Sequence, residues 1–439
     1  MKNIENLEYI PLEDVRVYQE LKLRELLNYV ATRSPFYKRM FQTTGINPLE
    51  ITCLESLQKL PVTTKEDLQH FNNDFLCVGH ELIIDYVTTS GTLGDPVTFA
   101  LTEADLKRLA RNEALSFMTA GCNSHDIIQL MTTIDRRFMA GLAYFLGSRE
   151  LGSAIVRVGN GIPELQWDTI HRVFPTTCIV VPSFLLKLID YARENDIDYH
   201  NCSLRRAICI GEPLRNPDYS LNTLGQKIAD LWPELSLHST YASTEMQTSF
   251  TECSYFAGGH HQPELIIVEF LDEYNQPVRE GEAGEVTITT LGVEGMPLLR
   301  FKTGDICYFT TQKCACGRTT TRLSPVIGRK GQMIKFKGTT LYPGALYDVL
   351  DNISGLTNYI VEVYTNSIGT DEIHVRVGSE NHTDEFKKHI KDAFRSKIRV
   401  APEVSFEDPS QISLIQNPVT SRKLVKFIDH RLRGGDYLH

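Results

Sequence analysis

The sequence predicts an α/β protein with a large N-terminal α/β domain, a β-rich part within that domain, and a small α+β domain at the C-terminus. Two observations support this fold class. Between residues 83 and 212, short β-rich runs alternate with amphipathic helical patterns, which is typical of a largely parallel sheet. After residue 263, strand patterns follow one another through glycine-rich turns, which favours antiparallel pairing.

The elements can be placed in chain order. The first eighty residues are polar and helical, and Thr64 is positioned to cap a helix with Asp67 three positions later. Residues 328–338 are dense in glycine and lysine, so we expect domains at 1–329 and 330–439. Strands are predicted at 83–90, 126–134, 154–159, 178–183, 206–212, 265–272, 277–291, 306–312, 359–365 and 371–378, and helices at 100–118, 137–151, 184–195 and 383–398.

The composition excludes several classes of protein. The 439 residues include 45 Lys and Arg against 55 Asp and Glu, and this net charge of −10 argues against nucleic-acid binding. The N-terminus lacks a signal-peptide core, and the longest apolar run, 178–189, is interrupted by Pro182, Ser183 and Lys187, so no membrane span is expected. Most of the ten cysteines stand singly in apolar stretches, which predicts a reducing, cytoplasmic location.

A candidate phosphate loop, TTSGTLGDP, covers residues 88–96 after a strand-like run. Its glycines permit a tight turn, and its hydroxyls and backbone N–H groups can cradle anionic oxygens. It is not a Walker loop, because the Gly-Lys-Ser/Thr ending is absent; an ordinary surface turn is the alternative interpretation. The candidate phosphate contacts are Thr88, Thr89, Ser90, Gly91, Thr92 and Gly94.

This loop resembles the Ser/Thr-Ser-Gly-Thr-x-Gly-x-Pro signature of the adenylate-forming superfamily. Five further segments resemble motifs of that superfamily and occur in the same order. The resemblance covers nearly the whole chain and implies the adenylate-forming fold, with a mobile C-terminal domain. The segments are CIGEPL (209–214), YASTEM (241–246), PLLRFKTGD (297–305), GRKGQMIKFKG (328–338) and NPVTSRKLVKF (417–427).

The resemblance implies a role for each segment. Thr244 would contact the α-phosphate, Glu245 would help to hold Mg²⁺, and Asp305 would accept bonds from the ribose hydroxyls. Lys423 would bring the acyl carboxylate to the α-phosphate, with Arg422 and Lys426 as alternatives. The remaining implied nucleotide contacts are Gly211, Glu212, Pro213, Tyr241, Ala242, Ser243 and Arg329.

Five positions depart from the superfamily pattern, one of them Arg422, which stands where glycine usually precedes the lysine. Ala242 stands where glycine is usual, and Gly331 and Gln332 replace an acidic pair, which leaves the hinge residue near Lys330–Gly331 open. Asp95 occupies the usual lysine position of the phosphate loop, which predicts a lower affinity for phosphate.

Several segments resemble the phenylacetate–CoA ligase branch, including SPFYKRMF (34–41), LPVTTKEDL (60–68) and PSFLLKLID (182–190). That branch implies ATP- and Mg²⁺-dependent activation of a carboxylic acid, such as the arylacetic acid phenylacetate, to acyl-AMP. Transfer to coenzyme A then gives acyl-CoA, AMP and pyrophosphate. Relatives are often homodimers. The implied acyl pocket, in RFMAGLAYFLGSRELG (137–152), contains Phe138, Ala140, Gly141, Tyr144 and Phe145, with plain core packing as the alternative.

A separate feature is a candidate Cys₃His zinc site formed by Cys253, His260, Cys314 and Cys316, which makes residues 253–316 a zinc-knuckle subregion. Some relatives carry the same pattern. His261 is the rival ligand, and three unrelated cysteines are the alternative interpretation. Four protein ligands leave no open position, so we expect any bound zinc to be structural.

Three other functions remain open. One is an adenylating enzyme with an acceptor other than CoA, as in the coenzyme F390 synthetases. A second is a catalytically silent nucleotide-binding relative, which the departures at Asp95, Gly331 and Gln332 motivate. The third is a zinc-dependent interaction protein. Thioester formation with CoA, pyrophosphate release and partner binding after zinc removal distinguish the three.

Overall fold

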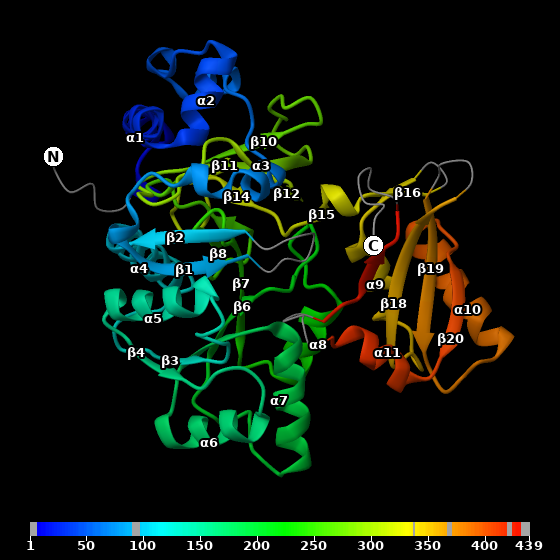
Figure 1. Cartoon of the computed structure of the whole chain (residues 1–439). Helices are drawn as coiled ribbons and strands as arrows, with labels where there is room; N and C mark the ends of the chain where they lie inside the picture. Colours follow the sequence, from blue (N-terminus) through cyan, green and yellow to red (C-terminus); the bar gives the residue numbers. More distant parts are fainter. Residues whose placement is uncertain (1–6, 90–96, 337–338, 367–370, 419–423, 432–439) are drawn as a thin grey trace. The chain divides into compact units, whose positions relative to one another are not determined.

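The computed structural model describes residues 7–89, 97–336, 339–366, 371–418 and 424–431 (Figure 1). The chain forms two compact units, Met1–Val326 and Ile327–His439. Short 3₁₀ helices lie at Leu7–Tyr9, Pro48–Glu50, Leu54–Lys59, Asn72–Phe75, His80–Leu82 and Lys330–Gln332. The predicted domain boundary after Arg329 and the hinge near Lys330 stay predictions.

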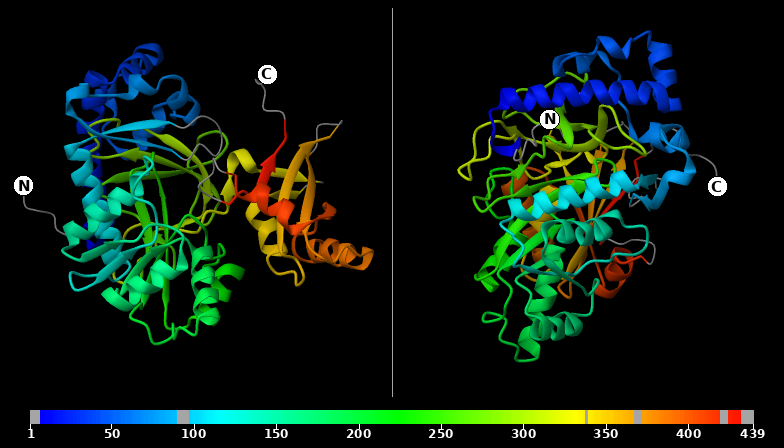
Figure 2. Two further views of the ribbon diagram at one scale, coloured as in Figure 1. Left: turned by 60° about the horizontal axis from the view of Figure 1, so that its bottom comes forward. Right: turned by 90° about the vertical axis from the view of Figure 1, so that its left-hand side faces the viewer.

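The first unit begins with helices α1 (Leu12–Arg33), α2 (Pro35–Thr44) and α3 (Lys65–His70), and α1 is the long blue helix in the right panel of Figure 2. The predicted cap at Thr64 is present, because its hydroxyl accepts a bond from the amide of Asp67 while Asp67 bonds back. These helices bury Leu23, Leu27 and Val30 in the main core of the unit.

The central sheet of the first unit has the strand order β13-β14-β9-β8-β7-β6-β5-β3-β4. Strands β4, β3, β5, β6 and β7 pair in parallel, as the alternating sequence pattern predicts, and the others pair antiparallel. The bounds are β3 Ile127–Leu130, β4 Ala154–Arg157, β5 Thr177–Val180, β6 Arg206–Ile210, β7 Ser236–Ser243, β8 Thr248–Glu252, β9 Gly259–His260, β13 Phe309–Thr310 and β14 Arg322–Leu323.

Helices cover both faces of the parallel strands (Figure 1). Cys178 and Val180 of β5 pack against α6 (Pro163–Val173), α7 (Pro182–Glu194) and α8 (Thr223–Leu231). Ile179 of the same strand faces the other way, with Phe117 of α4 (Glu103–Thr119) and Tyr144 of α5 (Met139–Leu151). Burial on both faces explains why these strands are continuously apolar rather than alternating.

Two antiparallel groups complete the first unit. Strands β10 (Ile266–Leu271), β11 (Gly284–Thr290) and β12 (Phe301–Cys307) pair in chain order, as the glycine-rich turns predict. Among the described residues, strand β1 (Ile83–Thr88) forms a two-stranded antiparallel sheet with β2 (Thr98–Thr102). The predicted strand at 83–90 therefore lies outside the parallel sheet, because the connection to β2 is too short for a parallel crossover.

The second unit contains the sheet β20-β19-β18-β21, with α10 packed on one face through Phe386, Ile390 and Phe394. The two strands and the helix predicted here are present. The bounds are β15 Gly328–Arg329, β16 Ile334–Phe336, β17 Thr339–Leu341, α9 Pro343–Leu350, β18 Asn358–Thr365, β19 Asp371–Gly378, α10 Asp384–Ile398, β20 Glu403–Glu407, α11 Pro409–Gln416 and β21 Phe427–Asp429.

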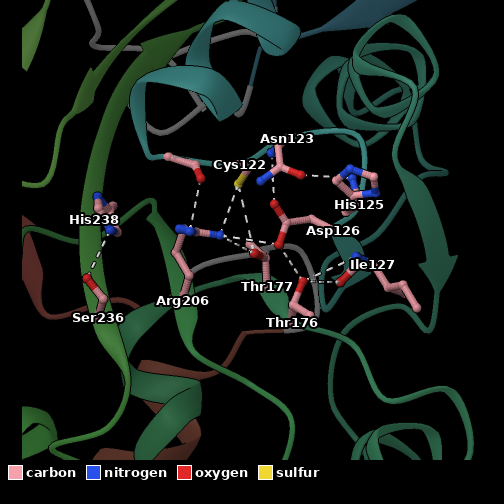
Figure 3. Close-up of polar contacts among 11 residues, drawn as sticks. Cys122, Asn123, His125, Asp126, Ile127, Thr176, Thr177, Arg206, Ser236 and His238 are labelled. Carbon is pink, nitrogen blue, oxygen red and sulfur yellow. Dashed lines mark hydrogen bonds and ion pairs between the residues drawn. The ribbon is translucent and has the colours of Figure 1, made fainter.

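A polar network ties together the amino ends of β3, β5 and β6 (Figure 3). Arg206 donates hydrogen bonds to Thr177 Oγ1 (2.9 Å) and to the carbonyl of Gly121 (3.0 Å), and its guanidinium lies 3.5 Å from Asp126 Oδ1. The hydroxyl of Thr176 donates to the same carboxylate at 2.6 Å. Because both charged groups are paired, this edge of the sheet is held by structural contacts.

Among the described residues, no helix combines the length and the apolar character needed to cross a bilayer. All ten cysteines lie in the described part of the chain and are free thiols.

Candidate active site

Two of the predicted nucleotide-binding segments, 209–214 and 241–246, lie at the carboxyl ends of neighbouring parallel strands, where open α/β sheets bind their ligands. Gly211 directly follows β6, and Tyr241–Ser243 form the end of the neighbouring strand β7. Segments from separate parts of the sequence therefore reach one edge of the sheet, opposite to the network of Figure 3.

The contact that joins two predicted motifs is a hydrogen bond from the Tyr241 hydroxyl to Asp305 Oδ2, at 2.8 Å. Asp305 is only 7% exposed, and its amide donates to the Thr303 hydroxyl at 3.1 Å. Burial and the adjacent carboxylate raise the pKa of Tyr241 well above its ordinary value. The phenol therefore stays protonated and fixes the orientation of Asp305.

The turn that carries Thr244 and Glu245 is held by backbone contacts. The amide of Met246 donates to Ser243 Oγ, and that of Gln247 to the Ser243 carbonyl, both at 3.3 Å. Within the described part of the chain, no hydrogen bond or ion pair engages the half-buried side chains of Thr244 and Glu245. A phosphate-bridging cation prefers oxygen ligands of the kind that Glu245 offers.

Arg108 of α4 holds the residues that follow this turn, Gln247 and Thr248. It was not predicted from the sequence. It is fully enclosed, and its guanidinium donates to the carbonyls of Gln247 (2.7 Å), Leu291 (2.7 Å) and Leu265 (2.5 Å) and to the Thr248 hydroxyl (3.1 Å). Burial lowers its pKa to about 10. The spacing of Arg108, Asn112 and Ser116 by four residues is the available sequence signal, since it places three polar groups on one helix face.

The candidate phosphate loop is closed at its base. The amide of Thr89 donates to the Val97 carbonyl and the amide of Val97 donates to Thr89 Oγ1, each at 3.0 Å. Thr88 and Thr89 are both 6% exposed. The other four predicted contacts, Ser90, Gly91, Thr92 and Gly94, and the atypical Asp95 lie outside the described residues.

The predicted adenine-binding segment makes structural contacts with helix α7. Gly211 adopts φ +79°, which turns the chain away from β6. Glu212 then accepts bonds from the amide (2.8 Å) and hydroxyl (3.0 Å) of Ser183 at the start of α7. Its carboxylate thus lies at a helix N-terminus, where negative charge is favourable. The adenine-binding role of Gly211, Glu212 and Pro213 stays a prediction.

The predicted acyl-pocket residues cluster around the start of α5. A Cβ on Gly141 would lie 2.1 Å from the carbonyl oxygen of Thr133, so the helix can approach that loop only with glycine there. Tyr144 is buried, with its ring 6.3 Å from that of Phe117, and the guanidinium of Arg157 lies over the Phe145 ring. Phe138 and Ala140 are half-buried.

The four predicted metal ligands meet in space, although they come from two distant stretches of sequence. Their ligand atoms all lie within 4.8 Å of one another. Cys253 Sγ is 3.7 Å from Cys314 Sγ, and Cys316 Sγ is 3.6 Å from His260 Nε2. A tetrahedral zinc ion with ordinary bond lengths separates two sulfurs by about 3.8 Å and sulfur from nitrogen by about 3.6 Å. The donor set therefore fits zinc.

The rival ligand His261 is engaged elsewhere, since its Nε2 lies 2.6 Å from the carbonyl of Ile266. Burial, with the nearby Arg318 and Arg322, lowers the pKa of His260 to about 3, so its imidazole is neutral and can act as a ligand. The geometry thus favours His260 as the fourth member of the set.

In the second unit, Arg329 ends β15, whereas Lys423 and its neighbour Arg422 lie outside the described residues. Lys426, the other alternative, donates to the Tyr359 hydroxyl at 3.0 Å and lies 3.4 Å from Asp351 Oδ1. Lys426 therefore already has structural partners within its own unit.

The comparisons with known proteins agree with the motif order. Residues 80–294 match the model of the AMP-binding enzymes, and residues 338–431 match the AMP-binding enzyme C-terminal domain. The phenylacetate-coenzyme A ligase of Thermus thermophilus is 30% identical over 84% of this chain and 83% of its own length. The chain belongs to the phenylacetate–CoA ligase family. The Escherichia coli phenylacetate-coenzyme A ligase is 26% identical over 82% of each chain.

Solved structures establish the fold of this family member. A 2-hydroxyisobutyryl-CoA ligase in complex with R3-HIB-AMP matches with a TM-score of 0.83, at 22% identity, over 98% of this chain and 94% of its own. ATP-bound MatB from Rhodopseudomonas palustris matches with a TM-score of 0.57, at 16% identity, over 76% of this chain and 66% of its own. The predicted adenylate-forming fold is confirmed.

Proposed function

We propose that this phenylacetate–CoA ligase family member is an AMP-forming acid–thiol ligase that uses ATP to convert a carboxylic acid to acyl-AMP and then transfers the acyl group to coenzyme A. The products are acyl-CoA, AMP and pyrophosphate. An arylacetic acid such as phenylacetate is the proposed substrate class, because the curated relatives are phenylacetate-coenzyme A ligases. The observation that carries the proposal is the Tyr241–Asp305 hydrogen bond, which joins two nucleotide motifs in a member of that family.

The proposed reaction depends on positioning and on charge neutralisation. The substrate carboxylate attacks the α-phosphorus of ATP, and pyrophosphate leaves from the loop at Thr88 and Thr89. Asp305, oriented by Tyr241, holds the ribose hydroxyls. Mg²⁺ bound by Glu245 would neutralise phosphate charge, while Thr244 contacts the α-phosphate. Lys423 lowers the repulsion between the two anionic reactants, which reaches several kcal/mol in a closed site.

The acyl group is proposed to bind beside the start of α5, near Phe138, Ala140 and Gly141. Aromatic and small side chains at this point suit a flat aryl group. A cytoplasmic location and a homodimer remain part of the proposal.

A structural zinc ion is proposed at Cys253, His260, Cys314 and Cys316. The four ligand atoms and their separations support this assignment. The ion would join the segments around Cys253 and Cys314, which are 61 residues apart in sequence. With four protein ligands it would have no open position for substrate.

The experiment that tests the proposed reaction is acid-dependent ATP–pyrophosphate exchange across a panel of aryl and aliphatic acids, followed by detection of thioester with CoA. We expect exchange with arylacetic acids and thioester from the same acids. Exchange without thioester would assign a different acceptor. If none of the acids in the panel supported pyrophosphate exchange, the ligase activity would be refuted.

A further inference from the structure

We propose that Arg318 and the segment Leu7–Ile10 form the outer shell of the Cys₃His site, so that metal binding anchors the segment that precedes helix α1. This inference rests on the proposed zinc site. It goes beyond the four ligands, because it assigns a function to a buried ion pair and to an N-terminal segment that the adenylation reaction does not use.

The outer shell begins at Arg318, two residues after the ligand Cys316. The Arg318 Nη1 donates to Cys316 Sγ at 3.7 Å, and its Nε donates to Glu8 Oε2 at 3.1 Å. The side chains of Arg318 and Glu8 are each 8% exposed. A chain of contacts from the Cys316 sulfur through the guanidinium to the carboxylate therefore joins the metal site to the N-terminal segment through side chains that are largely shielded from water.

Further hydrogen bonds hold the same segment against the turn 314–319, which carries two of the cysteines. The amide of Thr319 donates to the Glu8 carbonyl at 2.8 Å, and its hydroxyl donates to the Ile10 carbonyl at 2.5 Å. The ring of Tyr9 lies 5.0 Å from the Arg318 guanidinium, at a distance suited to a cation–π contact. This turn is closed by a bond from the Cys314 amide to the Arg318 carbonyl and one from the Gly317 amide to the Cys314 carbonyl, each at 2.9 Å.

Charge balance supports an anionic metal centre here. A second buried arginine, Arg322 of β14, lies opposite His260 in the backbone pairing of β14 with β9. Its guanidinium donates to the carbonyls of Ala257 (2.6 Å) and Gln312 (3.1 Å). Arg318 and Arg322 carry two positive charges and Glu8 carries one negative charge. A zinc ion with three thiolates would carry one net negative charge, which the two guanidinium groups would help to offset.

The contacts described above attach the N-terminal segment to residues 318 and 319, while the following helix α1 has attachments of its own. Leu23, Leu27 and Val30 of α1 are buried in the main core of the unit, and Gln19 donates to the carbonyls of Pro263 (3.1 Å) and Ile266 (3.0 Å). Loss of the metal should therefore release residues 7–10 and leave α1 in place. Groups that orient or balance metal ligands typically change metal affinity by about 10- to 100-fold when they are removed.

The test compares the zinc-loaded and chelated full-length protein by hydrogen exchange and mass spectrometry. We expect faster exchange after chelation in peptides covering 7–11 and 314–319, with unchanged exchange in the body of α1. Zinc affinity is then measured by chelator competition for Arg318→Met and Glu8→Gln. The matched control is Arg39→Gln, which removes an exposed pair with Asp74. We expect about tenfold weaker zinc binding for Arg318→Met, a smaller loss for Glu8→Gln and no change for the control.

Two negative results have different meanings. If the full-length protein binds no zinc, the proposed metal itself is wrong, and the inference falls with it. If zinc binds tightly but neither variant weakens it, and chelation leaves exchange at 7–11 unchanged, the outer-shell role is wrong while the metal site stands. Should Arg318→Met fail to fold, the exchange comparison on the unmodified protein and the Glu8→Gln affinity still decide the question.

Discussion

Tyr241 and Asp305 are separated by 64 positions and meet through one hydrogen bond of 2.8 Å. Each was predicted as part of its own motif, but the bond between them is visible only in the folded chain. In the role proposed for Asp305, a buried carboxylate that binds two ribose hydroxyls needs a fixed orientation, so the loss of one donor should reduce nucleotide binding more than stability.

The substitution Tyr241→Phe tests this role. Removing the hydroxyl should lower kcat/KM for ATP by about tenfold, which corresponds to about 1.4 kcal/mol, with a small change in the free energy of unfolding. Tyr199→Phe is the control, because it removes a 3.1 Å bond to the Leu231 carbonyl in the helical layer. Steady-state kinetics with varied ATP make the comparison. Equal kinetic effects of the two variants would contradict the positioning role.

Position 141 requires glycine for a steric reason. The Gly141→Ala variant places a Cβ 2.1 Å from the Thr133 carbonyl oxygen, so either the loop or α5 must shift. We expect a loss of about 1–3 kcal/mol in urea unfolding, together with a higher KM for the acid. Gly344→Ala serves as the matched control, because nothing lies within 4 Å of its added methyl group and the residue is in helix α9. An unchanged stability of Gly141→Ala would show that the loop gives way freely.

The burial of several charged side chains could not be predicted from the sequence, for one physical reason. Arg108, Glu113 and Arg318 are charged, and a charged residue in a helix or turn is ordinarily solvated. Their burial depends on acceptors supplied by strands far along the chain, such as the Leu291 carbonyl for Arg108. The metal ligands were predictable because cysteine and histidine at these spacings have few alternative uses, and the four do converge.

At the scale of elements, the interface between α4 and α5 combines close packing with a buried acid. A Cβ on Gly147 of α5 would lie 2.2 Å from the Glu113 Cβ of α4, so the two helices touch at this point. Glu113 accepts one bond from Asn112 at 2.9 Å, and its other oxygen is unpartnered among the described residues. Burial raises the pKa of Glu113 to about 8.

This carboxyl group predicts a pH dependence of stability. Because the folded-state pKa lies above the unfolded value, the folded protein binds the extra proton between about pH 4.5 and pH 8. Stability should therefore fall as the pH rises through that window. Glu113→Gln should be more stable than the parent protein at pH 8.5, by at least about 1 kcal/mol, and nearly equal to it at pH 4.5. Urea unfolding at both pH values measures the difference, and a constant difference would contradict the assignment.

The order and type of the elements followed from sequence better than their pairing did. The β-rich runs at residues 178–183 and 206–212, which alternate with helical patterns, were predicted as strands of a largely parallel sheet, and β5 and β6 do pair in parallel. The run at 83–90 was predicted in the same way, yet β1 pairs antiparallel with β2, since pairing also depends on the length of the connection between strands.

At the scale of the whole molecule, the protein consists of two units, and the proposed reaction uses both. The first unit carries Tyr241, Asp305 and the base of the phosphate loop, while the proposed lysine Lys423 belongs to the second. We expect Lys423→Ala to lose acid-dependent pyrophosphate exchange by at least about 100-fold, because it removes charge neutralisation from the adenylation step. Thioester formation from supplied acyl-AMP and CoA should be retained. An equal loss in both half-reactions would contradict a role limited to adenylation.

Acid-dependent ATP–pyrophosphate exchange, measured side by side for the unmodified enzyme and for Asp305→Ala, tests the central claim most directly. With phenylacetate or another arylacetic acid, we expect exchange in the unmodified enzyme and a loss of at least about 100-fold in the variant. Exchange of equal rate in Asp305→Ala would show that the nucleotide is not held at the edge of the sheet where Tyr241 meets Asp305.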